Sequence, residues 1–349
     1  MTTALTTLPQ QPADTPWPTT AWPLGELPKS ADTATLGRLL DHAFAAEAPD
    51  DLGETHALVI VQGGRLIHER YWTGFGPDVT CPSWSKAKSI TQALIGILVG
   101  DGKIDIHAPV DAPEWREAPN DPRAAITLDL LLRMSSGLAF REDYVDDQAS
   151  DVIEMLWGKG KDDVAHFAAS FPLAHQPGTF WSYASGTTNI IARAAARAAN
   201  AYGPDFEAFM HKRLFDPIGM SSAAPKFDKA GTFIGSSFCF ATPRDFARFG
   251  LLYLRDGIWE GSRILPEGWV DYARSPTWQQ AEAESPYGAQ WWLGLGGPGS
   301  FSANGFEGQF TVIIPELDMV IVRHGKSPAA KSDSVKSWIR AISDCFRHK

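Results

Sequence analysis

The sequence has little of what marks nucleic-acid-binding, membrane-spanning or exported proteins. Acidic residues outnumber basic ones, 41 to 31, and the formal net charge of -10 argues against a general basic patch for DNA, RNA or an anionic membrane. Residues 1–30 contain no basic segment followed by an apolar core, and no later stretch reaches about 18 uninterrupted apolar residues. We therefore expect a soluble, cytoplasmic protein with neither nucleic-acid nor membrane partners.

Residues that would build metal, disulfide or cofactor sites are also few or badly spaced. Cys81, Cys239 and Cys345 lie far apart and lack the paired spacing of a zinc site or a disulfide framework. The nine histidines are scattered without a His-Glu-x-x-His pair, no Gly-x-x-x-x-Gly-Lys loop occurs, and no dinucleotide-type glycine pattern follows a predicted strand. We therefore expect buried free thiols, no metal and no cofactor. A Gly-x-Ser-x-Gly elbow is absent too, which removes support for the hydrolases built around that turn.

The order of strand and helix patterns indicates the fold class. At 349 residues, 44% of them hydrophobic and 21% charged, the chain can bury a full core as one large domain or two interleaved ones. Apolar runs predict a β-hairpin over 56–71 across Gly63-Gly64, a second hairpin over 309–323 and a closing helix over 334–346. Helical patterns dominate in between. We therefore predict an α/β (α+β) fold, in which both ends of the chain form an antiparallel sheet flanked by helices, with an inserted, mostly helical region.

These patterns divide the chain into three parts. Residues 1–30 are rich in Pro, Thr and Trp without a helical or strand period, and we expect an extended N-terminal arm there. Residues 31–105 and 246–349 are assigned to the sheet domain. Residues 106–245 are assigned to the inserted helical domain.

One stretch at a predicted helix start, 83–89, combines hydroxyls with amines. It contains two overlapping Ser-x-x-Lys matches, Ser83/Lys86 and Ser85/Lys88. Residues three apart share a helix face, so the amine can take the proton of the hydroxyl and create a nucleophile. At about 100° per residue, Ser85 and Lys88 fall on a small or polar stripe, whereas Lys86 projects on the apolar side. We therefore predict Ser85 as the nucleophile; the alternative is an ordinary capped amphipathic helix with two solvated lysines.

A second stretch brings a phenol to another predicted helix start. Tyr183 lies in the loop 176–186, with Ser185 two residues further on. In such a loop a phenol can be held beside a Ser/Lys pair, although packing is the usual role of an aromatic residue there. Tyr183 is therefore a candidate only in combination with the first stretch.

Taken in order, these motifs resemble those of the serine β-lactamase-like hydrolases, related to class C β-lactamases and penicillin-binding proteins. The resemblance covers about residues 35–345 and is nearest to the branch of 6-aminohexanoate-dimer hydrolase and the carboxylesterases. It implies a β-lactamase/transpeptidase-like fold. Blocks 132–138 and 244–252 also agree with the family. The matching motifs are Ser85-Lys86-Ala87-Lys88 for Ser-x-x-Lys, Tyr183-Ala184-Ser185 for Tyr-x-Asn/Ser, and Gly305-Phe306-Glu307-Gly308-Gln309 for the third motif.

The resemblance also implies roles for single residues. Ser85 forms an acyl-enzyme, Lys88 or Tyr183 acts as the base, and Tyr183 passes a proton to the leaving group. The backbone N–H groups of Ser85 and Phe306 form the oxyanion hole. A solvated loop is the alternative for Tyr144, and core packing for Trp181. The residues expected to contact the substrate are Tyr144, Trp181, Ser185, Gly305 and Glu307.

One departure from the family pattern bears on the substrate. Many lactamases and D-peptidases carry Lys or His at the start of the third motif, where it supplies positive charge for a substrate carboxylate, whereas residues 302–305 supply none. We therefore predict a serine hydrolase for a small ester or amide, of the carboxylesterase or 6-aminohexanoate-oligomer amidase type. The alternatives are a β-lactamase or D-amino-acid peptidase, and a non-catalytic binding or sensor protein that retains the fold.

Overall fold

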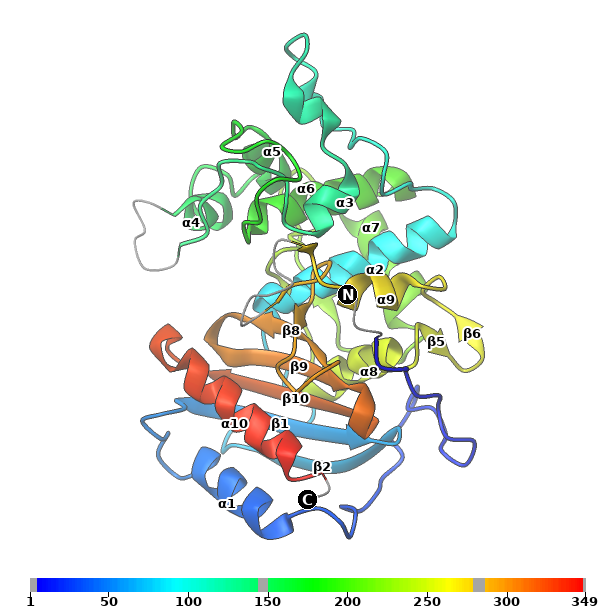
Figure 1. The fold of residues 1–349 in the computed structure, drawn as a ribbon, viewed down its shortest axis with the longest axis vertical. Helices are drawn as coiled ribbons and strands as arrows, with labels where there is room; N and C mark the ends of the chain where they lie inside the picture. Colours follow the sequence, from blue (N-terminus) through cyan, green and yellow to red (C-terminus); the bar gives the residue numbers. More distant parts are fainter. Residues whose placement is uncertain (1–4, 144–149, 279–285, 348–349) are drawn as a thin grey trace.

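The two predicted hairpins lie in one antiparallel sheet, in a computed structural model that describes residues 5–143, 150–278 and 286–347. The strand order is β2-β1-β10-β9-β8-β7, so strands from both ends of the chain pair directly (Figure 1). The predicted fold class is therefore confirmed. The strands of this sheet are β1 (Glu54–Gln62), β2 (Arg65–Tyr71), β7 (Trp292–Leu293), β8 (Phe301–Gly305), β9 (Gln309–Ile314) and β10 (Met319–Lys326). Two short ribbons pair β3 (Ala224–Pro225) with β4 (Cys239–Phe240), and β5 (Ile258–Trp259) with β6 (Ser262–Arg263).

Helices cover both faces of the sheet. α1 and α10 pack on one face, α8 packs on the other, and α2 runs between the sheet and a group of helices formed by the middle of the chain (Figure 1). The helices are α1 (Thr33–Ala43), α2 (Ala87–Gly100), α3 (Leu128–Leu132), α4 (Asp151–Leu156), α5 (Val164–Ala169), α6 (Ser185–Ala199), α7 (Pro204–Met210), α8 (Pro243–Leu254), α9 (Trp269–Arg274) and α10 (Ser332–Asp344).

Strand β1 lies between β2 and β10, and its sequence is apolar at successive positions from Leu58 to Val61. Leu58 and Ile60 belong to the core cluster under α1 and α10, whereas Val59 and Val61 belong to the cluster under α2 and α8. All four side chains are fully buried. Because successive side chains of a strand point to opposite faces, a strand covered on both faces needs apolar residues at every position.

The ends of the sheet region show how the chain closes it. Gly25 N donates to Leu66 O at 3.0 Å and Leu66 N donates to Pro23 O at 2.9 Å, so the early chain covers the open edge of β2. On the other side, Thr242 caps α8 by accepting from Asp245 N. The predicted boundary at 245/246 falls inside α8, and the three-part division of the chain stays a prediction.

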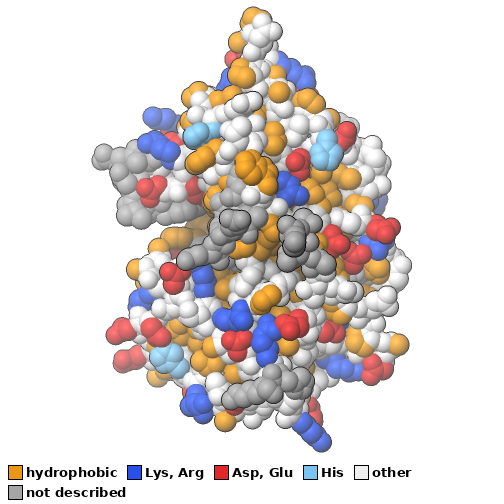
Figure 2. All heavy atoms as spheres, viewed as in Figure 1, with side chains coloured by type: hydrophobic (Ala, Val, Ile, Leu, Met, Phe, Trp, Pro, Cys, Tyr) orange, Lys and Arg blue, Asp and Glu red, His pale blue; other side chains and the backbone are white. Residues whose placement is uncertain are grey.

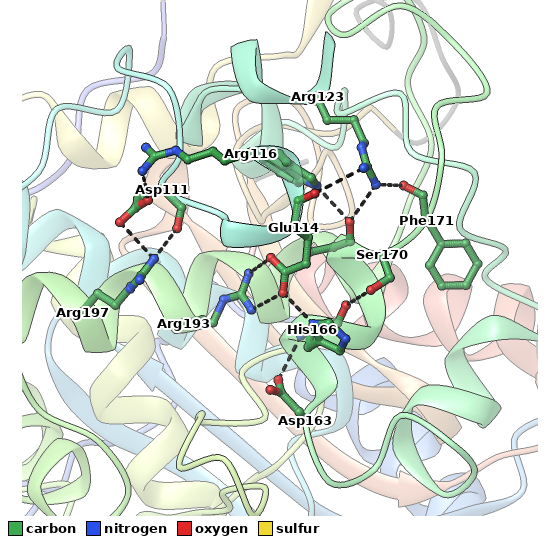
Figure 3. Close-up of polar contacts among 12 residues, drawn as sticks. Asp111, Glu114, Arg116, Arg123, Asp163, His166, Ser170, Phe171, Arg193 and Arg197 are labelled. Atoms are coloured by element: carbon green, nitrogen blue, oxygen red, sulfur yellow. Dashed lines mark hydrogen bonds and ion pairs between the residues drawn. The ribbon is translucent and has the colours of Figure 1, made fainter. Parts of the chain in front are cut away.

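A buried acid joins three segments of the helical part (Figure 3). Glu114 is 7% exposed, accepts two hydrogen bonds of 2.8 Å from Arg193 of α6, and lies 2.8 Å from Nδ1 of His166 of α5. Burial acts to raise the pKa of Glu114, but the hydrogen bonds from Arg193 and His166 outweigh it and lower the pKa to about 2. This ion pair holds in place the helix α6, whose first residue, Ser185, is one of the predicted site residues.

The cysteines and the lengths of the helices complete the description of the fold. Cys81, Cys239 and Cys345 are free thiols and all three are buried, as predicted. None of the helices within residues 5–143, 150–278 and 286–347 is both long and apolar enough to cross a lipid bilayer.

Candidate active site

The segment with the two Ser-x-x-Lys matches forms a short 3₁₀ turn that runs into a buried helix. The turn η1 covers Trp84–Lys86, and α2 begins at Ala87 with every side chain of its first three turns buried. Ser85 therefore lies at the tip of the turn and remains partly exposed, while Lys88 lies in the first turn of α2. Lys88 Nζ donates to Ser85 Oγ at 3.1 Å.

Lys88 is buried in polar surroundings. Besides Ser85, its Nζ donates to Ser185 Oγ at 2.9 Å and to Ser236 O at 3.0 Å. Burial lowers the pKa of Lys88 from 10.5 to about 8, and the negative charge of Glu142 opposes part of that change. An amine with this pKa is present in its neutral form in a useful fraction near neutral pH, so it can accept the proton of the Ser85 hydroxyl.

The structure does not bring the other match together. The Ser83 hydroxyl is fully buried, donates to Ser237 O at 3.2 Å and accepts from Cys239 N at 2.9 Å, so it has a structural use. Lys86 Nζ lies 2.8 Å from His324 Nε2 and 3.3 Å from the ring centroid of Phe246. Neither group of this pair therefore reaches the other.

Tyr183 completes the group around Ser85. Its ring centroid lies 4.8 Å from Lys88 Nζ, and its side chain lines the same cavity as Ser85. Burial and then the charge of Glu142 raise the pKa of Tyr183, and the nearby Ser85 hydroxyl lowers it by less. The phenol consequently keeps its proton at neutral pH. The three predicted catalytic side chains lie together.

Glu142 was missed from the sequence as a partner of this group. Its two carboxylate oxygens accept from Ser185 N at 2.8 Å and from Ser185 Oγ at 2.7 Å, at the start of α6. Since Ser185 Oγ in turn accepts from Lys88, a continuous line of hydrogen bonds runs from Glu142 to Ser85. The acidic composition of the loop that holds Glu142 was the available signal, but it does not reveal which carboxylate turns inward.

The residues predicted to contact the substrate differ in their surroundings. Ser185 is fully buried and its hydroxyl is shared by Lys88 and Glu142, so it contacts the amine rather than the cleft. Trp181 packs against the rings of Tyr287 and Trp292, at 5.7 and 6.3 Å, and its Nε1 has no hydrogen-bond partner among the residues described. Tyr144 lies outside the described residues.

The third motif passes next to the nucleophile segment. β8 ends at Gly305, where an added Cβ would lie 2.4 Å from Ser83 O, so only glycine permits this approach. Phe306 follows and is 37% exposed. Trp84 Nε1 then donates to Glu307 Oε2 at 3.2 Å, which ties the residue before Ser85 to the residue after Phe306. The backbone N–H groups of Ser85 and Phe306 remain the predicted oxyanion hole.

A cavity of about 780 Å³ opens at this group, a size suited to a small-molecule ligand. Ser85, Tyr183 and Trp292 line one part of it together with Phe306 and Glu307. Figure 2 shows a hollow in the surface between the helical part and the sheet part, with hydrophobic side chains inside. The cavity continues toward α10, whose contributions are Ser332, Lys336, Ser337, Arg340, Ala341 and Asp344. No group of three or more His, Cys, Asp or Glu that could hold a metal ion occurs in the part of the chain that the structure describes.

The chain is similar to known proteins over most of its length. Residues 50–340 match the family model described as Beta-lactamase. The chain is 26% identical over 294 residues to the 6-aminohexanoate-dimer hydrolase of Paenarthrobacter ureafaciens, covering 78% of this chain and 73% of that protein. A solved Bacillus anthracis structure, provisionally named a 6-aminohexanoate-dimer hydrolase, is similar with a TM-score of 0.73 at 24% identity, over 97% of this chain and 89% of that one. A family VIII carboxylesterase is similar with a TM-score of 0.67 at 14% identity, over 92% and 99% of the two chains.

Proposed function

Because the chain belongs to the β-lactamase family, we propose that it is a serine hydrolase that cleaves a small ester or amide through an acyl-enzyme on Ser85. One observation carries the proposal: Lys88 Nζ lies 3.1 Å from Ser85 Oγ and has a pKa of about 8. A solvated lysine with its ordinary pKa would hold its proton at neutral pH and would have no lone pair to offer. The buried amine has one in a useful fraction of molecules.

The proposed acylation step uses the three side chains in sequence. Neutral Lys88 takes the proton of Ser85 as Oγ bonds to the substrate carbonyl carbon, and the carbonyl electrons move to its oxygen. The N–H groups of Ser85 and Phe306 stabilise that oxyanion, a contribution typically worth about 10²–10³ in rate for each donor. As the tetrahedral intermediate collapses, Tyr183 donates its proton to the leaving oxygen or nitrogen, and the Lys88 ammonium restores it. Water then cleaves the acyl-enzyme with Lys88 again as the base.

We assign the base to Lys88 and the proton donor to Tyr183. The raised pKa of Tyr183 keeps the phenol protonated, so a phenolate would be a rare species in the free protein. The lowered pKa of Lys88 has the opposite effect and makes its neutral form accessible. The two shifts separate the acid from the base.

The substrate class follows from the charges around Ser85. Residues 302–305 supply no cation for a substrate carboxylate, and Glu307 lines the same cavity. Among the described residues that line the cavity, the cations are Lys336 and Arg340, which lie on α10 and are paired with Asp333 and Asp344. These charges favour a neutral ester or amide over a β-lactam acid. The relative named 6-aminohexanoate-dimer hydrolase supports the inclusion of amides.

Steady-state kinetics test this proposal. We expect hydrolysis of short p-nitrophenyl esters, or of the matching p-nitroanilides, at a kcat/KM that exceeds the value for a chromogenic cephalosporin. Ser85→Ala is expected to lower kcat/KM by about 10³-fold or more. Faster turnover of the cephalosporin would contradict the substrate class. An unchanged Ser85→Ala variant would contradict the mechanism, and stable acylation without turnover would favour a binding or sensor protein.

A further inference from the structure

Four aromatic side chains from four segments meet beside the nucleophile. Trp84 directly precedes Ser85, Trp157 ends α4, Phe238 precedes β4 and Phe306 follows β8. The ring centroid of Trp84 lies 5.6 Å from that of Phe238, 5.7 Å from Phe306 and 6.4 Å from Trp157. Trp157 and Phe238 are 6.2 Å apart. We call this group the aromatic cluster.

The aromatic cluster differs from the aromatic packing of the core in its exposure. Trp157 is 51% exposed and Phe306 is 37% exposed. By contrast, Trp291 and Tyr253, whose rings lie 4.5 Å apart behind the site, are fully buried. Large aromatic side chains that stay half-exposed in a group of this kind typically mark a ligand-binding surface rather than a finished core.

The position of Trp84 is set by its backbone and by a hydrogen bond. Its φ of 45° lies in the left-handed region, which a bulky residue rarely adopts because it strains the backbone. Its Nε1 donates to Glu307 Oε2 at 3.2 Å, and Glu307 also has a positive φ of 59°. Strained residues of this kind persist where the surrounding structure requires them. The indole is therefore held in one place beside Ser85, as a preformed wall of a binding site would be.

The aromatic cluster is continuous with the cavity of the proposed site. Phe306 lines that cavity together with Ser85 and Tyr183, and Trp84 is covalently next to Ser85. A substrate whose carbonyl reaches Ser85 can therefore direct one of its substituents toward these rings. The occupant of the cluster is then part of the substrate itself.

We propose that the aromatic cluster is a subsite that selects substrates with a bulky apolar group, an aryl ring over a short alkyl chain, on one side of the scissile carbonyl. This proposal rests on the proposed function and names its substrate class. An aryl ring gains both burial of apolar area and edge-to-face contacts with Trp84 and Phe306, whose own rings meet at 88°. A short alkyl chain buries less apolar area and makes no edge-to-face contact.

The test compares two ester series by titration of released acid. Benzyl acetate against ethyl acetate varies the alcohol side, and ethyl phenylacetate against ethyl butyrate varies the acyl side. We expect an aryl preference in kcat/KM on the order of tenfold in one series, arising mostly in KM. Trp157→Ala should reduce that ratio to near one, and Trp157→Phe should retain most of it.

Tyr202→Ala is the matched control. Tyr202 is 45% exposed and lies beyond the far end of α6 from Ser185, roughly 20 Å away along the helix axis. Its removal should leave the aryl ratio unchanged. Hydrolysis without an aryl preference in either series, or a preference that survives in Trp157→Ala, would overturn the subsite and leave the proposed function standing. Absence of hydrolysis of these four esters, of the p-nitrophenyl esters and of the p-nitroanilides would overturn both.

Discussion

Lys86 and Lys88 lie two residues apart and are both buried, yet their amines have opposite surroundings. Lys88 Nζ has three hydrogen-bond acceptors and a carboxylate, Glu142, one hydroxyl away. Lys86 Nζ instead faces the ring of Phe246 and the imidazole of His324. Burial lowers the pKa of Lys86 well below its usual value, and burial first and the neighbouring Lys86 second lower the pKa of His324 well below its own usual value.

The difference shows what makes a buried lysine useful for proton transfer. Burial without an opposing negative charge pushes a buried amine toward its neutral form, as at Lys86. At Lys88 the charge of Glu142 opposes the effect of burial and the pKa is about 8, so the charged and the neutral forms both occur near neutral pH. A base that must accept a proton from Ser85 and later return it needs both forms.

Of the two lysines, Lys88 should affect activity far more when it is replaced. Lys88→Met removes the proposed base but keeps a side chain of similar length, and we expect kcat/KM for a p-nitrophenyl ester to fall by about 10³-fold. The fold should persist, because the substitution removes a costly buried amine. Circular dichroism and thermal melting check the fold. Activity within tenfold of the wild type would show that another group takes the proton.

Glu114 is a buried acid that is paired with a cation, Arg193. We expect its replacement to have the second-largest effect, on the free energy of unfolding. Glu114→Gln leaves the Arg193 guanidinium without its carboxylate, so we expect the free energy of unfolding at pH 7 to fall by about 2 kcal/mol. The pKa of Glu114 is depressed to about 2, so its contribution is present above its ordinary value of 4.5 and is lost as the pH falls toward 2. Urea unfolding should therefore show a difference between wild type and variant that shrinks below pH 4.5. The exposed neighbour Glu117→Gln serves as the control and should show no such difference.

Removing the charge of Glu142 should have a smaller effect, a shift of the kcat/KM profile along the pH axis. Glu142→Gln keeps an oxygen to accept from Ser185 but no longer raises the pKa of Lys88. We therefore expect the acid limb of kcat/KM, set by Lys88 near pH 8, to move to lower pH by up to about one unit, or about 1.4 kcal/mol. The matched change Glu154→Gln, in α4, should leave the limb in place. A limb that moves to higher pH would contradict the assigned sign.

Replacing Lys86 should have the smallest effect. Lys86→Met removes the contact between the amine and His324, which destabilises the fold by about 1 kcal/mol. It also removes the cost of keeping an amine away from water, which acts in the opposite direction. We expect stability within about 1 kcal/mol of the wild type and kcat/KM within about threefold. A loss of activity comparable to that of Lys88→Met would mean that the two lysines do not have separate roles.

Features of the fold and the site that depend on local periodicity could be predicted from the sequence. Both hairpins and the closing helix follow from apolar runs and turn residues, and the sheet they form is the one observed. The choice of Ser85 with Lys88 rested on residues three apart sharing a face. That relation holds although Ser85 lies in a 3₁₀ turn and α2 begins only at Ala87, because residues three apart also align in a 3₁₀ helix.

The rest depends on contacts between distant parts of the chain. The partner of Lys86 is 238 residues away and that of Glu307 is 223, and no spacing in the sequence relates them. The alternative of two solvated lysines is wrong, because both amines are buried. The resemblance implied a substrate contact for Ser185, whose hydroxyl is buried between Glu142 and Lys88 in the structure. Charge type alone did not identify which acid of the 141–147 loop would do this.

The central claim is that Ser85, and not Ser83, carries the reactive hydroxyl. A fluorophosphonate that labels activated serines, followed by peptide mass spectrometry, tests it directly. We expect a single modified serine at Ser85 in the wild-type protein, the same modification in Ser83→Ala, and no modification in Ser85→Ala. Label on Ser83, or label that persists in Ser85→Ala, would contradict the account.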